Sequence, residues 1–347
     1  MWYSARRMNW EGTKREGRRR DHGNAPDAAA DPGSSGKAAK PGDSATPVRR
    51  AARRRRAWAG ETVWILGASS GIGRALAEEL AAAGARLILS SRESPRFQDV
   101  VEACARVTPT QAAPVDLGDP AAAEGLAARL FAPGTGNVAG RGNAAGQGNA
   151  AGAGVGVGLP TMVIYAAGVS QRSRLAETEG AVVDRVMNVN FRSALAVTRE
   201  AGRAFAAVGA GRIVVLSSLA AYAPTPFRGV YSAAKSALGV AATTLRAELA
   251  EAGVQVTLAV PGFVRTEISA SALRGDGSAH GVTDPNQATG MDAGRCARVI
   301  LRGVERGRDE VWVAMGVRGR IAVALGRLAP RLQRRLLARV PTTTAES

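Results

Sequence analysis

The stretch from Gly67 to Gly73, which reads Gly-Ala-Ser-Ser-Gly-Ile-Gly, constrains this chain most strongly. It follows the apolar run 62–66, typical of a buried strand, and precedes residues 74–80, whose composition favours a helix. Glycines at such a junction let backbone N–H groups and the positive helix end approach a phosphate closely. The stretch therefore predicts a site for a nucleotide pyrophosphate, although a tight turn without a ligand has the same spacing.

Charge is unevenly distributed along the 347 residues, whose formal net charge is +17. Residues 1–59 hold 15 Lys and Arg against 6 Asp and Glu, and residues 291–347 hold 12 against 5. The central body is nearly neutral, so the charge gives little reason to expect a nucleic-acid-binding domain. A length of this order accommodates one large domain or two ordinary ones.

Cysteine and histidine usage argues against several kinds of site. Cys104 and Cys296 lie far apart, without the spacing of a metal site or a disulfide framework. His22 and His280 give little support to histidine catalysis. The sequence also has no run of about 18 apolar residues and no signal-peptide core. We therefore expect a cytoplasmic protein without a metal site.

Residues 1–59 mix Arg, Gly, Pro, Asp and Ala without helical or strand periodicity, and they include four consecutive arginines at 53–56. Too little apolar content is present to offset the entropy of ordering, so we expect a disordered basic arm. A solvated arm is favoured over one that touches nucleic acid or an anionic membrane.

From residue 61 onward, short apolar runs alternate with Ala- and Leu-rich helical patterns, which is typical of βαβ units. We expect strands at 62–66, 86–90, near 114–117, and at 161–165, 212–218, 254–260 and 310–314. We expect helices at about 120–131, from 182 to 205, and at 231–249 and 292–306. The pattern predicts an α/β fold: a doubly wound, Rossmann-type, seven-stranded parallel sheet in a single domain, residues 60–315.

Residues 133–158 interrupt this alternation. They contain three copies of a six-residue unit, starting at Gly136, Gly142 and Gly148. Three short copies with small residues do not provide the core of a β-helix. We expect a flexible insertion in a surface loop that is dispensable for folding.

The end of the expected strand 86–90 bears on which dinucleotide binds. An acidic residue there commonly holds the ribose hydroxyls of NAD, whereas an arginine suits the 2′-phosphate of NADP. Ser91 and Arg92 follow the strand with no acid before Glu93, and Arg74 follows the glycine turn. The sequence therefore favours NADP(H) over NAD(H), with a solvated loop charge as the alternative for Arg92.

Tyr231 and Lys235 carry the strongest chemical signal. At i and i+4 of an expected helix they project from one face, about a turn apart. An ammonium group near a phenol stabilises the phenolate and lowers its pKa, so that tyrosine can act as an acid or base near neutral pH. Ser218, at the end of the preceding expected strand, could hydrogen bond a substrate carbonyl at the same place.

With these motifs in this order, residues 61 to 315 resemble the NADP-dependent short-chain dehydrogenases/reductases, and among them the hydroxysteroid-dehydrogenase-like and DHRS7-like branch. The resemblance implies that Tyr231 exchanges the proton, that Lys235 binds the nicotinamide ribose, and that Ser218 polarises the carbonyl. It also implies that Asn190 holds a water in the proton relay. Thr266, in the Pro-Gly-Phe-Val-Arg-Thr segment after the sixth strand, would fix the carboxamide.

The resemblance also implies a set of cofactor contacts. Gly67, Gly71 and Gly73 would cradle the pyrophosphate, while Asp116 and Leu117 would contact adenine, a role for Asp116 that competes with capping the turn. The remaining implied contacts are Ser69, Ser70, Ile72, Ser91, Arg92, Ala167, Gly168, Pro261, Gly262 and Val264, together with Tyr231 and Lys235.

Two positions depart from the family pattern. Leu66 stands where the family commonly has Thr, and Tyr165-Ala166-Ala167-Gly168 stands where it has Asn-Asn-Ala-Gly. Those polar residues tie the first and fourth strand ends together in the family. Their joint replacement suggests an apolar contact between Leu66 and either Tyr165 or Ala166, which need not cost stability.

We therefore expect an NADP(H)-dependent oxidoreductase that interconverts a carbonyl and a primary or secondary alcohol, with Tyr231 as proton donor or acceptor. The alternative is a Rossmann-type protein that binds the nucleotide without catalysis. The partner would be a small-molecule substrate rather than nucleic acid, and the resemblance implies a homo-oligomer. The sequence identifies neither the substrate nor the physiological direction.

The C-terminal region contains two further segments of interest. Residues 267–290 are rich in Ser, Ala and Gly and lie where the family carries a substrate-covering segment, which we expect to be mobile. Residues 316–347 form a basic tail, with seven arginines and no acid between 318 and 340, split into two amphipathic pieces by Pro330. Residues 316–340 either lie peripherally on the inner face of a membrane or pack on the domain or on another copy.

Overall fold

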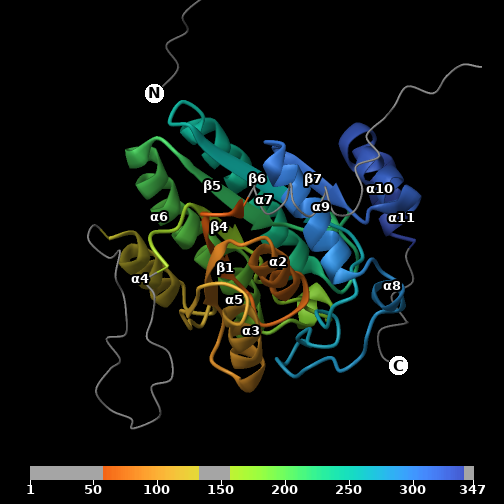
Figure 1. Ribbon diagram of the computed structural model, residues 1–347. Coiled ribbons are helices and arrows are strands. Elements are labelled where there is room, and N and C mark those ends of the chain that lie inside the picture. Colours follow the sequence, from red (N-terminus) through yellow and green to blue (C-terminus); the bar gives the residue numbers. More distant parts are fainter. Residues whose placement is uncertain (1–57, 133–156, 340–347) are drawn as a thin grey trace, which may run out of the picture. The chain divides into compact units, whose positions relative to one another are not determined.

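The computed structural model describes residues 58–132 and 157–339. Its strands are β1 (Thr62–Leu66), β2 (Arg86–Ser90), β3 (Thr110–Ala112), β4 (Met162–Tyr165), β5 (Gly211–Leu216), β6 (Val254–Pro261) and β7 (Glu310–Val313). They form one sheet in the order β3-β2-β1-β4-β5-β6-β7, and each neighbouring pair is parallel. This confirms the predicted doubly wound Rossmann-type fold, with β7 as an edge strand (Figure 1).

Helices cover both faces of the sheet (Figure 1). The helices are α2 (Gly71–Ala82), α3 (Pro95–Ala105), α4 (Pro120–Phe131), α5 (Gly180–Met187), α6 (Ser193–Val208), α7 (Gly229–Leu249), α8 (Pro285–Ala288), α9 (Ala293–Glu305), α10 (Gly316–Leu328) and α11 (Pro330–Leu337). Two 3₁₀ turns, Leu175–Glu177 and η3 (Leu219–Ala221), and a π-helical turn, η2 (Asn188–Arg192), complete the described elements.

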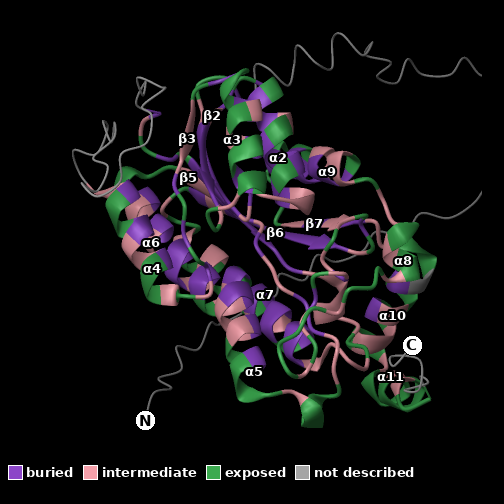
Figure 2. Ribbon diagram, turned by 90° about the horizontal axis from the view of Figure 1, so that it is seen from below, coloured by how far each residue is buried: buried purple, intermediate pink, exposed green. Residues whose placement is uncertain are grey.

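The alternation of side chains along β1 explains the two layers. Val63 and Ile65 pack into the apolar core beneath α2, α3 and α9, whereas Trp64 and Leu66 pack into the core beneath α4, α6 and α7. All five residues of β1 are buried, as expected for a central parallel strand that is covered on both faces. Figure 2 shows the same pattern, with the sheet strands mostly buried between helices that expose their outer sides.

The third strand is shorter than expected and ends at Ala112 rather than near Leu117. Regular pairing stops there because the carbonyl of Ala113 accepts from the Ser90 hydroxyl (2.6 Å), whereas the N–H that Pro114 lacks would point away from β2 at the edge of the sheet. Isolated backbone bonds continue beyond it, because Val115 donates to the carbonyl of Ser91 (2.9 Å). The chain thus reaches Asp116 in extended form, and Asp119 then caps α4 by accepting from Ala121 and Ala122.

The expected continuous helix from 182 to 205 is divided in the structure. α5 ends at Met187, the π-helical turn η2 follows, and α6 begins at Ser193. Asn190 stabilises the widened turn, since its side-chain amide donates to the carbonyls of Val186 (2.9 Å) and Val169 (2.8 Å). Single π-helical turns of this kind are frequent at functional sites.

The predicted ends of two segments are wrong by one or two residues. The predicted disordered arm includes Trp58, yet this residue is 2 % exposed, and its indole donates to Glu305 (2.8 Å). The predicted flexible insertion includes Val157, yet this residue is buried and its carbonyl accepts from the hydroxyl of Thr62 (2.7 Å). Both are apolar side chains that fit the core. The rest of the arm, 1–57, and of the insertion, 133–156, lies outside the described residues.

The C-terminal pieces form two helices, α10 and α11, divided before Pro330 as expected. They pack on the domain: Gln333 donates to the carbonyl of Tyr222 (3.3 Å), and Arg327 lies over the rings of Tyr222 (5.5 Å) and Trp312 (5.7 Å). No helix within the described ranges combines the length and the apolar content required to cross a bilayer.

Candidate active site

The glycine turn between β1 and α2 approaches the end of β4 so closely that side chains are excluded. A Cβ on Gly67, where φ is +86°, would lie 2.6 Å from the backbone of Ala167, and one on Gly73 would lie 2.1 Å from the carbonyl oxygen of Gly67. Ser91 ties the turn to the end of β2 by donating to Ser69 (2.8 Å). The turn thus leaves a backbone-lined cradle at the start of α2, which fits a pyrophosphate.

A cleft of about 700 Å³ extends from this turn along the carboxyl ends of the strands. The predicted cofactor residues that line it are Gly67, Ser69, Ser70, Gly71, Ile72, Gly73, Ser91, Arg92, Asp116, Leu117, Ala167, Gly168 and Thr266. Ligands of doubly wound folds bind at this end of the sheet. The cleft therefore fits an extended dinucleotide.

The arginines near the cleft differ from the expectation in one respect. Arg74 forms an ion pair with Glu78 on α2 (2.7 Å) and is not among the residues that line the cleft. Arg92 does line it, and so does Arg96, in the first turn of α3, which sequence reasoning did not select. Arg96 forms a two-bond ion pair with Glu267, which follows Thr266 and also lines the cleft.

Asp116 caps its own turn, because it accepts from the backbone N–H of Gly118 (2.8 Å). It also forms an ion pair with Arg185 (3.0 Å). Burial tends to raise the pKa of Asp116, but the hydrogen bonds from Arg185 and Gly118 outweigh burial and lower it. Asp116 therefore lines the cleft as a carboxylate, and its predicted contact with adenine stays a prediction.

A second cavity, of about 300 Å³, adjoins the cleft and is lined by three of the four predicted catalytic residues. Tyr231 and Lys235 reach it from the first turns of α7, and Ser218 reaches it from the start of η3, just beyond β5. Pro261, Gly262 and Val264 line the same cavity. Ile72, Ala166, Gly168, Thr266 and Ile268 line both spaces, so the two adjoin around the residues expected to surround a nicotinamide.

The electrostatics of Tyr231 differ from the expectation. Burial raises the pKa of the phenol, whereas a hydrogen bond with Ser218 and the charges of Arg228 and Arg172 lower it, and burial prevails. Lys235 donates instead to the carbonyl of Leu216 (2.9 Å) and, at 3.4 Å, to that of Ala167. Lys235 is not among the groups that shift the pKa of Tyr231 in this arrangement of side chains, so its expected effect on Tyr231 stays a prediction.

The pKa of Lys235 itself is strongly shifted. Burial in an environment of carbonyl groups lowers its pKa from 10.5 to about 7. Its ammonium group is therefore readily deprotonated near neutral pH unless an additional acceptor or negative charge stabilises it.

Asn190 lies in η2, behind the catalytic cavity, and is fully buried. Its side-chain oxygen has no hydrogen-bond partner among the described residues. A Cβ on Gly168 would approach that oxygen (2.9 Å) and the ammonium nitrogen of Lys235 (3.3 Å), so these groups face the same small space. An orphaned buried acceptor of this kind fits a bound water, as the predicted relay role requires.

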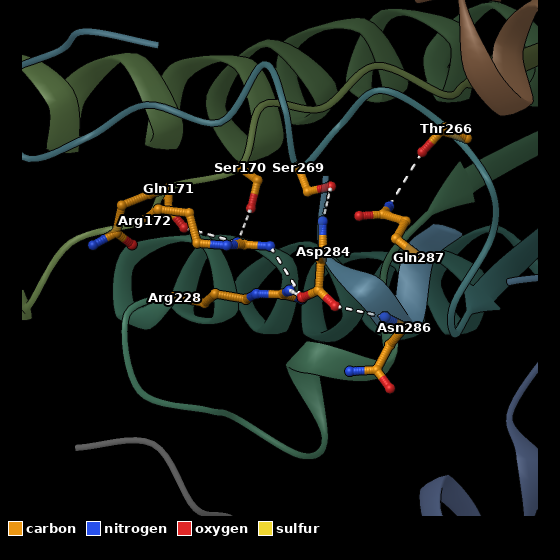
Figure 3. A network of polar contacts seen from close by, with 9 residues as sticks. All are labelled: Ser170, Gln171, Arg172, Arg228, Thr266, Ser269, Asp284, Asn286 and Gln287. Carbon is orange, nitrogen blue, oxygen red and sulfur yellow. Dashed lines mark hydrogen bonds and ion pairs between the residues drawn. The ribbon is translucent and has the colours of Figure 1, made fainter. Parts of the chain in front are cut away.

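An ion network at the other end of the catalytic cavity was missed by sequence reasoning (Figure 3). Asp284 accepts from Arg228 (2.6 Å) and lies 3.6 Å from Arg172, and both arginines line the cavity. Arg172 also donates to Ser170 (3.1 Å). Two guanidinium groups thus share one carboxylate, which leaves excess positive charge near Tyr231. The three residues lie far apart in the sequence, so no local pattern could reveal them.

The expected contact of Leu66 is present in the strand register. Leu66 is the register partner of Tyr165 on β4, and both side chains are buried in the same apolar core. The Tyr165 hydroxyl donates to the carbonyl of Val189 in η2 (2.7 Å). At this position the chain therefore has a hydrogen bond from β4 to the π-helical turn, in place of the polar contact between the first and fourth strands that is common in the family.

The fold and these residues define an oxidoreductase of the short-chain type. Residues 61–276 match the family model described as short chain dehydrogenase, so the chain belongs to this family. It is 34% identical over 278 residues to dehydrogenase/reductase SDR family member 7B of Danio rerio, covering 80% of this chain and 84% of that protein.

Solved structures share the fold at lower identity. A short-chain dehydrogenase from Sphingobium yanoikuyae in complex with NADPH superposes with a TM-score of 0.60 at 21% identity, covering 82% of this chain and 97% of that one. A bulky-bulky ketone specific alcohol dehydrogenase from Comamonas testosteroni gives 0.58 at 21% identity, covering 82% and 96%. The described residues contain no cluster of three or more His, Cys, Asp or Glu that could hold a metal.

Proposed function

We propose that this protein is an NADP(H)-dependent oxidoreductase that interconverts a carbonyl and a primary or secondary alcohol. The observation that carries the proposal is that Ser218, Tyr231 and Lys235 line one cavity, which adjoins the glycine-lined cleft through Ile72 and Gly168. A substrate carbonyl in that cavity would lie between the proposed acid and the nicotinamide-binding end of the cleft.

The proposed roles follow from the positions of the side chains. Ser218 holds the substrate oxygen, and Tyr231 exchanges a proton with that oxygen. Lys235 and Asn190 connect Tyr231 to a proton relay, since both face the space beside Gly168. The glycine turn binds the pyrophosphate of the dinucleotide, and Thr266 binds near its nicotinamide. When bound, the dinucleotide supplies or accepts the hydride.

The proposed preference for NADP(H) rests on Arg92, which lines the cleft near the end of β2; Arg96 lines it too, but its guanidinium group is paired with Glu267. No acidic residue precedes Glu93 after that strand. A guanidinium group suits the 2′-phosphate of NADP, whereas a carboxylate would repel it. The Sphingobium structure, which contains NADPH, has the same fold and is consistent with this preference.

A substrate screen tests the proposal. The purified protein is incubated with NADPH or NADH and a panel of ketones and aldehydes, and with NADP or NAD and a panel of alcohols, while absorbance of the reduced nicotinamide is followed. We expect turnover of at least one class, with higher kcat/KM for the phosphorylated cofactor. Tight NADPH binding without turnover of any class would favour the alternative of a non-catalytic nucleotide-binding protein.

The proposed setting of this activity is a cytoplasmic homo-oligomer that acts on a small-molecule substrate. Family membership supports the substrate class and is compatible with assembly. Size-exclusion chromatography with light scattering tests the oligomer, and fractionation of cells that express the protein tests the location. A monomer in the first experiment contradicts the proposed assembly and leaves the proposed chemistry intact.

A further inference from the structure

Helices α10 and α11 expose a row of large apolar side chains. The exposed fractions are 74% for Val317, 54% for Ile321, 85% for Leu328, 47% for Leu332 and 43% for Leu336. The three residues in α10 recur at spacings of four and seven, so they share one face of that helix. We call these five side chains the apolar stripe. Figure 2 shows α11 largely exposed as well.

The apolar stripe is not the face by which α10 packs on the domain. A Cβ on Gly319 would lie 3.0 Å from the side chain of Leu219, one on Gly326 would lie 3.1 Å from the carbonyl of Tyr222, and Val323 is buried. With 3.6 residues per turn, these positions lie about half a turn away from the stripe. α10 therefore has two apolar faces, and its packing on the domain accounts for only one of them.

The charge next to the stripe has one sign. The sequence contains no Asp or Glu between Glu310 and Glu346, while seven arginines lie between 318 and 340. The exposed arginines of these helices and of the turn just after α11 are Arg320, Arg327, Arg331, Arg334, Arg335 and Arg339. Within the described ranges, Arg327 lies over two aromatic rings, and none of the six forms an ion pair with a carboxylate. An anionic surface with an apolar interior complements both features.

Other occupants of the stripe fit less well. In a symmetric contact between two copies, the same arginines would face each other across the interface and repel. The chain segments outside the described residues do not supply the missing negative charge: 1–57 carries 15 basic against 6 acidic residues, 133–156 has no acid, and 340–347 has one. An anionic lipid surface offers acyl chains to the apolar stripe and negative headgroups to the arginines.

We propose that the exposed face of α10 and α11 docks on an anionic membrane surface, with the apolar stripe at the level of the acyl chains and the arginines among the headgroups. The docking does not depend on the proposed oxidoreductase function. It has a consequence for the site, because Gly319 and Ala322 on the opposite face of α10 line the catalytic cavity. One helix, roughly 10 Å thick, would then separate that cavity from the lipid.

Co-sedimentation of the full-length protein with vesicles tests this proposal. The vesicles contain phosphatidylcholine alone or phosphatidylcholine with phosphatidylglycerol. The stripe variant carries Ile321→Glu and Leu328→Glu. The matched control carries Val107→Glu, in the turn after α3, and Val240→Glu, in α7; these two side chains are 62% and 68% exposed. Both variants change the net charge equally and leave residues 1–57 intact. Circular dichroism and thermal unfolding check that both variants fold.

We expect the wild type and the control to bind the anionic vesicles. The partition coefficient of the stripe variant should be at least about tenfold lower. Partitioning onto phosphatidylcholine alone should be low for all three. Equal partitioning of the stripe variant and the control, or no partitioning of the wild type, overturns the proposal. The proposal is also overturned if the wild type binds duplex DNA but not vesicles and the stripe variant loses the DNA binding. That result would assign the face to nucleic acid.

Discussion

Tyr165 shows how a single side chain compensates for a departure from the family pattern. Its ring lies beside Leu66 in the core, and its hydroxyl holds the carbonyl of Val189 in the turn that contains Asn190. Burial raises its pKa well above the ordinary value, so the phenol stays protonated and donates. The position of the relay residue therefore depends on a hydroxyl that lies outside the catalytic cavity.

Tyr165→Phe should reduce the free energy of unfolding by about 1–3 kcal/mol, because the carbonyl of Val189 loses its buried donor. Tyr222→Phe is the matched control, since the hydroxyl of half-buried Tyr222 has no hydrogen-bond partner among the described residues. Urea unfolding measures both variants. Equal, small losses of stability would show that the Tyr165 hydroxyl does not support the π-helical turn.

Lys235 should make stability depend on pH in a defined window. Burial lowers its pKa from 10.5 to about 7, so between these values the unfolded chain holds a proton that the folded chain lacks. The contribution of Lys235 to the free energy of unfolding therefore rises with pH across that window. The difference in stability between the wild type and Lys235→Met should grow in favour of the wild type from neutral to alkaline pH. Parallel unfolding profiles of the two proteins contradict this expectation.

At the scale of elements, the turn between β1 and α2 requires glycine for two reasons: its backbone conformation, and the close approach of a neighbouring backbone. Gly67 and Gly84 have nearly the same φ, +86° and +85°, but a Cβ on Gly84 would meet nothing within 4 Å. Gly84→Ala should therefore cost about 1–2 kcal/mol for the left-handed conformation alone. Gly67→Ala should cost clearly more and weaken NADPH binding, since its Cβ would clash with Ala167. Urea unfolding and fluorescence titration measure both effects, and equal effects of the two substitutions would refute the steric argument.

The segment that precedes α9 is attached to the catalytic cavity by Asp284. Asp284→Asn removes the shared counter-charge of Arg172 and Arg228, so the two guanidinium groups should repel each other and displace the segment. We expect a several-fold rise in KM for the carbonyl substrate and an unchanged affinity for NADPH. Asp276→Asn, in the same segment but exposed, is the control. Steady-state kinetics measure KM, and NADPH titration measures the affinity for the cofactor. An unchanged KM would contradict the idea that Asp284 holds this segment at the cavity.

The sequence predicts elements well where the signal is local. The strands β1, β2 and β5 contain uninterrupted apolar runs at 63–66, 87–89 and 213–216, and Asp292 caps α9 as expected. The π-helical turn was missed because one widened turn barely alters helical periodicity. The ion network was missed because its residues are brought together by tertiary structure alone. Trp58 was misassigned because the basic residues before it dominate the local composition.

At the scale of the whole described chain, one sheet positions two adjoining spaces. The carboxyl ends of β1, β2 and β4 border the cleft, whereas those of β5 and β6 border the catalytic cavity. α7 supplies the proposed acid, and α10 closes the far wall of the cavity with Gly319 and Ala322. The order of the strands thus accounts for the meeting of the two spaces. The sequence predicted the doubly wound sheet, but neither this order nor the contribution of α10 was part of that prediction.

The central claim is that Tyr231 exchanges the proton with the substrate while the glycine-lined cleft binds the dinucleotide independently. Tyr231→Phe removes only the hydroxyl group. Turnover of the best substrate should fall by at least about a hundredfold. The Kd for NADPH, measured by fluorescence titration, should stay within a factor of about three of the wild-type value. The reason is that Tyr231 lines the adjoining cavity and not the cleft itself. Turnover near the wild-type rate would contradict the account.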